Sequence, residues 1–246
     1  MNDERQKADT GFPRYAIYYT PPRDSLLERF GAQLLGYDAW TGEELPFPDF
    51  ATQATVDWQH LTQDPRKYGF HATLKAPMPL ASDTTETELL AAYAAFAEKP
   101  RTIPVITPVV GAISGFIAVI PSATSGELER LATDCVREFD CFRAPLSPED
   151  RARRNPSALT PRQDELLDLW GYPYVMEQFR FHMTLTGRLD TVQLPLMLAM
   201  LQQRFFDIDI ARLAIDRIVL FRQDNANARF RIVSQWRLCK TDRSAS

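Results

Sequence analysis

The same five-residue pattern occurs twice in this chain, once in each half of its 246 residues. It reads FHATL at 70–74 and FHMTL at 181–185, so a histidine and a threonine alternate with apolar residues in both copies. Alternation with period two is typical of a strand that has one packed face and one open face. Two of the chain's three histidines fall in this pattern. The repeat therefore predicts a duplicated fold that brings two strand-borne imidazoles to one place.

The paired residue types suit proton transfer and anion binding. His71 shares a strand face with Thr73, and His182 shares one with Thr184. An unperturbed imidazole titrates near neutral pH, so one histidine can take a proton from water while the other protonates a leaving oxygen. A threonine hydroxyl can donate a hydrogen bond to an anionic oxygen. Two such strands facing each other form a clamp around a tetrahedral anion, for which phosphate is the obvious candidate.

Further side chains are candidates for binding the substrate, and each also has an ordinary structural interpretation. Lys75 lies on the strand face of His71, and Arg180 on that of His182, where each either adds positive charge or is a solvated strand residue. The basic stretch 143–154 is a candidate site for a second phosphate or a solvated loop face. Tyrosines near the strands suit a cleft wall or the core. These two groups comprise Arg143, Arg151, Arg153, Arg154, Tyr18, Tyr172 and Tyr174.

The expected order of elements repeats in the second half. Residue preferences, capping residues and proline or glycine stops predict strands at 14–20, 68–75, 102–113, 116–120, 178–186, 213–222 and 229–238, and helices at 24–35, 85–99, 125–139, 161–170 and 194–205. Each histidine strand is followed by helix, strand and strand, and residues 37–66 are expected to be irregular. This order predicts an α+β fold, duplicated and two-lobed, with two mainly antiparallel sheets facing a central cleft and helices outside.

We expect one domain over 14–238, built from two pseudo-symmetric lobes that each contribute one histidine strand, with tails at 1–13 and 239–246. The stretch 105–123 carries no charge, but its glycine and proline turn formers and β-branched residues predict a buried hairpin rather than a membrane helix. The first ten residues lack the apolar segment of a signal peptide. These features predict a cytoplasmic protein with no membrane partner.

Composition restricts the cofactors and partners. The net charge of −4 gives no general attraction to nucleic acid. Three cysteines are an odd count without a Cys-x-x-Cys spacing, which argues against a disulfide framework or a cysteine-rich zinc site. Zinc usually takes a third or fourth protein ligand, and the sequence beside His71 and His182 offers none. We therefore expect no metal and no cofactor, and we interpret His60, which lies in an irregular stretch, as structural.

On these motifs the chain resembles the 2H phosphoesterase superfamily, whose signature is two His-x-Thr/Ser motifs on a duplicated α+β fold. Within it, RKYGFHATLKAP at 66–77 and WGYPYVMEQFRFHMTLTG at 170–187 resemble the branch described as phosphonate-metabolism proteins, which is associated with carbon–phosphorus lyase gene clusters. The resemblance extends from residue 15 to residue 238. It implies that His71 and His182 act as general acid and base and that Thr73 and Thr184 bind the phosphate.

The resemblance also implies a substrate class. Its main expectation is a metal-independent cyclic phosphodiesterase acting on a small sugar or nucleotide phosphate, such as 5-phosphoribosyl 1,2-cyclic phosphate. One alternative is RNA-end processing or ligation, against which the acidic net charge argues mildly. Another is a non-catalytic regulator that binds a phosphate or nucleotide. The sequence leaves open which histidine is the acid, which product isomer forms and what the oligomeric state is.

Overall fold

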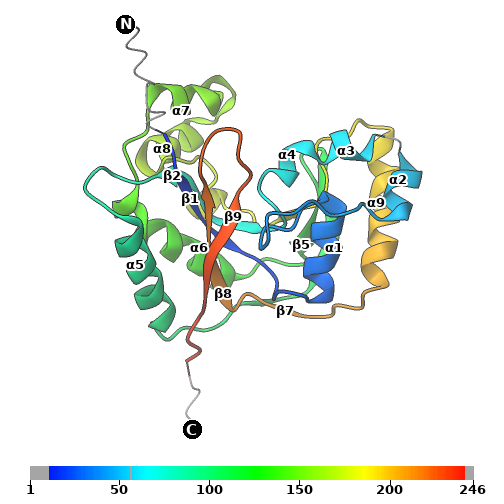
Figure 1. Cartoon of the computed structure of the whole chain (residues 1–246), viewed down its shortest axis with the longest axis horizontal. Coiled ribbons are helices and arrows are strands. Elements are labelled where there is room, and N and C mark those ends of the chain that lie inside the picture. Colours follow the sequence, from blue (N-terminus) through cyan, green and yellow to red (C-terminus); the bar gives the residue numbers. More distant parts are fainter. Residues whose placement is uncertain (1–10, 56, 242–246) are drawn as a thin grey trace, which may run out of the picture.

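A seven-stranded antiparallel sheet runs through the molecule, and part of each histidine motif lies in one of its strands (Figure 1). The structure, a computed structural model, describes residues 11–55 and 57–241. The strand order is β4-β5-β6-β2-β1-β8-β9, and a second, small sheet pairs β3 with β7. The strands are β1 (Arg14–Tyr19), β2 (Ala72–Pro79), β3 (Val105–Ile106), β4 (Pro108–Ile113), β5 (Phe116–Pro121), β6 (Met183–Thr184), β7 (Leu213–Ala214), β8 (Arg217–Gln223) and β9 (Arg231–Arg237).

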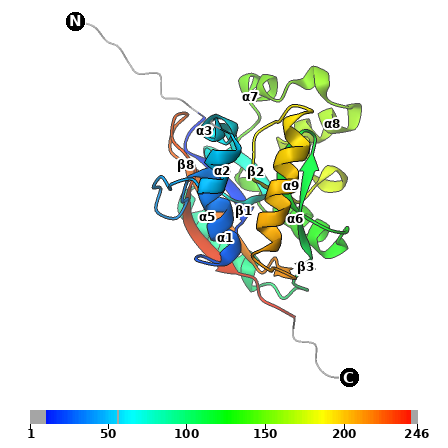
Figure 2. The same ribbon diagram turned by 90° about the vertical axis from the view of Figure 1, so that its right-hand side faces the viewer.

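Helices pack against this sheet at several places. α6 packs on β2, α9 on β4 and β5, and α5 on β8 and β9. Figure 2 shows α1 beside α9, where the rings of Phe30 and Phe205 lie 6.0 Å apart. The helices are α1 (Leu26–Leu35), α2 (Asp49–Ala54), α3 (Trp58–Leu61), α4 (Gln63–Arg66), α5 (Glu86–Glu98), α6 (Gly126–Glu138), α7 (Pro148–Arg153), α8 (Pro161–Trp170) and α9 (Gln193–Phe206), with 3-10 turns η1 (Asp140–Phe142), η2 (Pro156–Ala158) and η3 (Met176–Gln178). The expected α+β class with antiparallel pairing is confirmed.

The strands of the two halves join edge to edge where β2 pairs with β6. The hairpin β4–β5, which follows the first histidine strand in sequence, pairs with β6 and so lies beside the second motif. The hairpin β8–β9, which follows the second motif, pairs with β1, the neighbour of β2. Each hairpin thus flanks the motif of the other half. Because of this exchange, long-range pairing holds the two motifs next to each other.

Local sequence signals account for the helix ends near the site. Thr160 and Gln163 form a capping box at the start of α8, and Pro161 occupies its first turn. Gly171 ends the same helix in the left-handed conformation, with φ 71°. The expected helix 161–170 therefore has the expected ends. It delivers the following residues, 172–180, to the second histidine motif.

Several expected strands are shorter than predicted. The second histidine strand, expected over 178–186, is reduced to the two residues of β6 and is preceded by η3. Beyond β6 the pairing with β5 is irregular, because the N–H groups of Leu185 and Thr186 both donate to the carbonyl oxygen of Ile117, and the Thr186 hydroxyl accepts the N–H of Ile117 at 3.0 Å. The expected strand 102–113 is split, since β3 joins the small sheet and β4 the large one. The stretch 37–66, expected to be irregular, contains α2, α3 and α4.

The uncharged stretch 105–123 forms β3 and the hairpin of β4 and β5, so the predicted hairpin is confirmed. No helix in the described part of the chain is long and apolar enough to cross a membrane. Residues 1–10 and 242–246 of the expected tails lie outside the described residues. The C-terminal part that is described does pair with the fold, since Arg101 and Lys240 form a bridge.

Candidate active site

The pairing of β2 with β6 sets the arrangement of the two histidine motifs. Ala72 and Met183 are the paired residues, and both are fully buried on the packed face. In an antiparallel pair the flanking residues point to the other face of the sheet. Extending this register by one residue places His71 opposite Thr184 on that face. Extending it in the other direction places Thr73 opposite the second histidine.

The four motif side chains therefore form a quadrilateral with approximate two-fold symmetry. Directly opposed residues in an antiparallel pair have Cβ atoms about 4.5–5.5 Å apart, and diagonal neighbours about 7–8 Å. His71 and His182 occupy one diagonal, and Thr73 and Thr184 occupy the other. His182 is close enough to His71 to contribute to lowering its pKa. The register thus places two imidazoles and two hydroxyls on the same face of the sheet.

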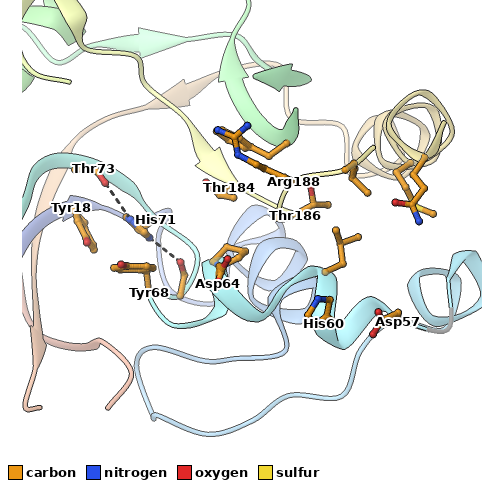
Figure 3. Close-up of a pocket in the computed structure, with 18 of the residues that line it drawn as sticks. Tyr18, Asp57, His60, Asp64, Tyr68, His71, Thr73, Thr184, Thr186 and Arg188 are labelled. Carbon is orange, nitrogen blue, oxygen red and sulfur yellow. Dashed lines mark hydrogen bonds between the residues drawn. The ribbon is translucent and has the colours of Figure 1, made fainter. Parts of the chain in front are cut away.

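A cavity in two adjoining parts opens onto this quadrilateral. The first part, of about 650 Å³, is lined by His71, Thr73 and Thr184. The second, of about 440 Å³, is lined by His182 and again by Thr73. Figure 3 shows the first part, with the side chains of the β2 motif on one side and those of Thr184 and Arg188 on the other. The residues that line both parts are Thr73, Phe116, Tyr172 and Arg188.

His71 is held by a main-chain hydrogen bond and an aromatic stack. Its Nδ1 lies 2.9 Å from the carbonyl oxygen of Gly69, which has φ 73°. The Tyr18 ring stacks on the imidazole with centroids 3.8 Å apart and planes at 21°. Burial lowers the pKa of His71 to about 4 against the raising effect of the Gly69 carbonyl, and the nearby His182 contributes to the lowering. His71 is therefore a neutral imidazole at pH 7.

His182 makes the same hydrogen bond in more open surroundings. Its Nδ1 lies 2.7 Å from the carbonyl oxygen of Arg180, two residues earlier, as Gly69 is two residues before His71. Its aromatic neighbour, Phe116, is tilted at 57° with the ring centroids 5.6 Å apart. Burial lowers the pKa of His182 as well, while the Arg180 carbonyl raises it. Each motif thus has its own Nδ1 hydrogen bond of the same kind, but the aromatic packing differs between the two.

A carbonyl oxygen only accepts, so both histidines must carry a proton on Nδ1. In the neutral imidazole this leaves a lone pair on Nε2, and in the imidazolium it leaves a donor there. For His71, Nε2 lies 3.3 Å from the Thr73 hydroxyl, which donates to it in the neutral form (Figure 3). Each histidine therefore offers Nε2 for proton transfer, as base when neutral and as acid when charged.

Lys75 does not point into the cleft, where it was predicted to bind phosphate. Its side chain is 4% exposed, and its Nζ donates to Asp140 Oδ1 at 2.8 Å and to the carbonyl oxygen of Val136 at 3.2 Å. The pairing of β1 with β2 explains why Lys75 is buried. Tyr18 pairs with Thr73, but Ile17, the preceding residue of β1, pairs with Lys75. One extra residue of β2 is thus inserted after Thr73, and the strict alternation ends there. The expectation that Lys75 binds phosphate is corrected: it is a buried ion-pair residue.

The side chain of Arg143 also binds other protein groups and does not line the cavity. Its Nε and Nη2 donate to the two carboxylate oxygens of Asp140 at 2.8 and 3.1 Å, and Nη2 also donates to the carbonyl oxygen of Leu169, near the end of α8, at 3.1 Å. The interpretation of Arg143 as a substrate ligand is therefore corrected in favour of a structural ion pair. Asp140 binds both Lys75 and Arg143, so it links the first histidine strand to α8.

The other predicted binding residues do reach the cavity. Tyr18 and Arg154 line its first part, and Tyr174 and Arg180 line its second. Tyr18 is buried behind His71, whereas the Tyr174 side chain is largely exposed. Their roles in binding stay predictions.

The sequence analysis did not identify three side chains that line the cavity near the histidines, nor the group of polar side chains at its far wall. Arg188, Phe116 and Tyr68 line the cavity, and the cation just after the second motif was a signal that could have identified Arg188. His60, interpreted as structural, is exposed and lines the far wall of the first part together with Asp57 and Asp64 (Figure 3). No group of three or more His, Cys, Asp or Glu side chains within the described ranges is arranged to hold a metal ion.

Two curated proteins are similar to most of this chain. The "Ribose 1,5-bisphosphate phosphokinase PhnN" of Janthinobacterium sp. (strain Marseille) is 35% identical over 221 residues, which is 88% of this chain and 49% of that protein. The protein of the same name from Laribacter hongkongensis (strain HLHK9) is 33% identical over 219 residues, 89% of this chain and 50% of that protein. The chain thus spans about half the length of the curated relatives it matches.

Solved structures with similar folds include E. coli LigT. The complex with 3'-AMP has a TM-score of 0.46 and 14% identity, covering 92% of this chain and 99% of that one. The complex with NADP+ has a TM-score of 0.41 and 13% identity, covering 93% and 98%. These likenesses are too distant to assign an activity.

A family model matches residues 73–231, which is more than half of the chain and runs from the threonine of the first motif through all of the second. The family is described as "Protein of unknown function (DUF1045)". On that match, this chain belongs to the DUF1045 family.

Proposed function

We propose that this chain is a phosphoesterase that opens a small cyclic phosphodiester by general acid–base catalysis with two histidines and without a metal ion. The observation that supports this most strongly is the quadrilateral of His71, Thr73, His182 and Thr184 on one open face. A merely structural histidine pair would not need the same Nδ1 hydrogen bond in both motifs, which directs each Nε2 away from the main chain.

In the proposed reaction the cyclic phosphate lies between the two imidazoles, with its non-bridging oxygens toward the hydroxyls of Thr73 and Thr184. Nε2 of one neutral histidine accepts a proton from water as the water oxygen forms a bond to phosphorus. The P–O bond to the sugar breaks, and Nε2–H of the other histidine protonates the departing oxygen. The product is a phosphomonoester with a free hydroxyl.

The surroundings of the two histidines favour one assignment of roles. His71 stays neutral because it is buried against Tyr18 and its pKa is about 4, so it suits the base. His182 lacks that stack, and a bound anionic phosphate raises the pKa of an adjacent histidine. We therefore assign His71 as the base and His182 as the acid.

The names of the curated relatives support a phosphorylated ribose as substrate. Those proteins are named for ribose 1,5-bisphosphate, and the present chain matches half of each. Hydrolysis of the P–O2 bond in 5-phosphoribosyl 1,2-cyclic phosphate yields ribose 1,5-bisphosphate. This substrate is therefore our first candidate, within the wider class of small sugar and nucleotide cyclic phosphates.

The RNA-processing alternative is less well supported by the charge of the cavity. Asp57 and Asp64 line the far wall of its first part, where they would repel the phosphates of a polymer. The net charge of −4 points the same way. A small substrate held at the histidine end avoids both carboxylates.

Phosphorus NMR of a panel of cyclic phosphates tests the proposal. The panel contains 2′,3′-cyclic nucleotides and ribose 1,2-cyclic phosphates with and without a 5-phosphate, each incubated with the protein in EDTA. We expect a new phosphomonoester signal from at least one member, and its coupling identifies the product isomer. Loss of activity on chelation would contradict the metal-free step. Binding of a cyclic phosphate that stays unchanged would favour the non-catalytic regulator.

A further inference from the structure

The arginines between residues 143 and 188 divide into two groups by their ion pairs. The first group has carboxylate partners within 4.0 Å: Arg143 with Asp140, Arg151 with Asp164 and Asp168, Arg153 with Asp150, and Arg162 with Glu165 and Glu177. The second group consists of Arg154, Arg180 and Arg188, and none of these has a carboxylate partner among the described residues. The three arginines without such a partner are also the three that line the cavity.

Whether an arginine has a carboxylate partner depends on whether it faces the cavity and not on its position in the sequence. Arg153 and Arg154 are adjacent, yet Arg153 is exposed and paired whereas Arg154 is partly buried and faces the first part of the cavity. An arginine that is partly buried without a counter-ion is unfavourable unless an anion arrives, because its charge loses hydration and gains no compensating pair. Uncompensated positive charge around a cavity is therefore an indication of an anionic ligand.

Arg154 and Arg188 occupy different positions along the cavity. Arg188 lines both parts together with Thr73, so it lies where the reacting phosphate is proposed to bind. Arg154 lines the first part only, and its guanidinium lies over the Tyr172 ring, 5.0 Å from the centroid. Burial, Tyr68 and Tyr172 raise the pKa of the Tyr18 hydroxyl, and the nearby charge of Arg154 opposes that rise. Arg154 therefore belongs to an aromatic wall beside the histidine pair.

We propose that Arg154, seated on Tyr172, forms a second anion subsite that binds a phosphomonoester group of the substrate distinct from the cyclic phosphate being opened. This inference rests on the proposed function for the identity of the reacting group, and it narrows the substrate class to cyclic phosphates that carry a second phosphate. The cation–π contact with the Tyr172 ring holds the guanidinium at the cavity wall, and a guanidinium can donate two parallel hydrogen bonds to phosphate oxygens.

The rest of the cavity is consistent with one such subsite. The far wall contains Asp57 and Asp64, which disfavour a second phosphate there. Arg180 lines only the second part, and its Nη1 already donates to the carbonyl oxygen of Phe179 at 2.9 Å. Arg154 is thus the cation best placed to bind a second phosphate on a substrate whose first phosphate lies between the histidines.

Calorimetric binding of D-ribose 5-phosphate, D-ribose and inorganic phosphate to the full chain tests the subsite without requiring turnover. We expect Arg154→Gln to weaken binding of ribose 5-phosphate by about 10-fold or more, as expected for a lost charge-assisted hydrogen bond. The matched control is Arg153→Gln, which replaces the neighbouring arginine, whose charge is already paired with Asp150. This variant should change the affinity for ribose 5-phosphate less than about 2-fold. Undetectable binding of ribose 5-phosphate to the wild type, or equal affinity in wild type and Arg154→Gln, would overturn the proposal.

A kinetic comparison separates this subsite from the clamp on the reacting phosphate. With a 1,2-cyclic phosphate that carries a 5-phosphate, Arg154→Gln should raise KM about 10-fold or more, while kcat/KM for the same ring without the 5-phosphate should stay unchanged. Equal losses on both substrates would place Arg154 at the reacting phosphate and overturn the subsite. If no cyclic phosphate is turned over but the calorimetric difference persists, the proposed function fails and the anion subsite stands.

Discussion

The two histidine motifs make the same hydrogen bond in different surroundings. Nδ1 of His71 and Nδ1 of His182 each bond to the carbonyl oxygen two residues earlier. His71, however, precedes the eight-residue strand β2 and stacks on Tyr18, whereas His182 precedes the two-residue strand β6 and has a tilted phenylalanine as its aromatic neighbour. The motif itself sets the tautomer, and tertiary packing sets how readily each ring is protonated. This difference supports our proposal that the two copies of the motif have different roles.

The largest expected effect comes from removing either imidazole. His71→Ala and His182→Ala should each lower kcat by at least about 10²-fold on the substrate found by phosphorus NMR, because one removes the base and the other the acid. His60→Ala is the matched control, since it removes the remaining histidine, which lies outside both motifs. Near-full activity in either motif variant would refute the assignment of that histidine.

Replacing the hydroxyls tests whether the two halves of the quadrilateral contribute equally. Thr73→Val and Thr184→Val keep the branched shape and remove the donor, so each should lower kcat/KM by about 10-fold or more. Thr73→Val also removes the hydroxyl 3.3 Å from Nε2 of His71, so it should shift the imidazole resonances of His71 more than Thr184→Val does. Steady-state kinetics and NMR of the free protein measure the two effects, and identical behaviour of both variants in NMR would argue against that contact.

The lowered pKa of His71 has a consequence for stability. The unfolded state binds a proton at an ordinary pKa near 6.5, whereas the folded state binds it only near pH 4. Between these values the unfolded state holds more protons, so the free energy of unfolding should fall as pH decreases from 6.5 towards 4. Urea unfolding of the wild type and His71→Gln at pH 7 and pH 5 tests this, because the wild type should lose more stability than the variant. An equal loss would show that His71 does not contribute.

The smallest expected effects concern the cation that belongs to each motif. Lys75→Met removes one partner of the buried pair with Asp140, so it should lower stability by about 1–2 kcal/mol and leave KM unchanged. Arg180→Gln removes a side chain in the cavity wall, so it should raise KM a few-fold and leave stability unchanged. Denaturation midpoints together with KM values measure both, and a raised KM in Lys75→Met without loss of stability would restore its role as a phosphate ligand.

The features that were predictable from sequence are those fixed by short-range rules. The period-two pattern placed His71 and Thr73 on an open face, and the capping signals with Gly171 placed the ends of α8. The inserted residue after Thr73 was not predictable, because it depends on the register with β1, and it turned Lys75 from a cleft residue into a buried one.

Long-range pairing explains the other differences. The sequence did not indicate that the hairpin β4–β5 would join the second motif, because nothing within 105–123 specifies its partner strand. It also did not separate Arg143 from Arg154, since only the folded chain brings Asp140 to the first and leaves the second facing the cavity. Ion pairing across the fold, rather than the number of arginines in a loop, identifies the candidate ligands.

The central claim is that the two motifs divide proton transfer, with His71 as base and His182 as acid. The pH dependence of kcat/KM for the wild type, His71→Ala and His182→Ala tests it most directly, using a cyclic phosphodiester that does not itself titrate between pH 4 and 8. For the wild type, kcat/KM should follow a bell-shaped pH profile with its acid limb near pH 4 and its maximum below pH 6.5. This is because the pKa of each histidine is lowered. The residual activity of His71→Ala should lose the acid limb, and that of His182→Ala should lose the alkaline limb. Loss of the same limb in both variants, or a wild-type maximum above pH 7, would contradict the account.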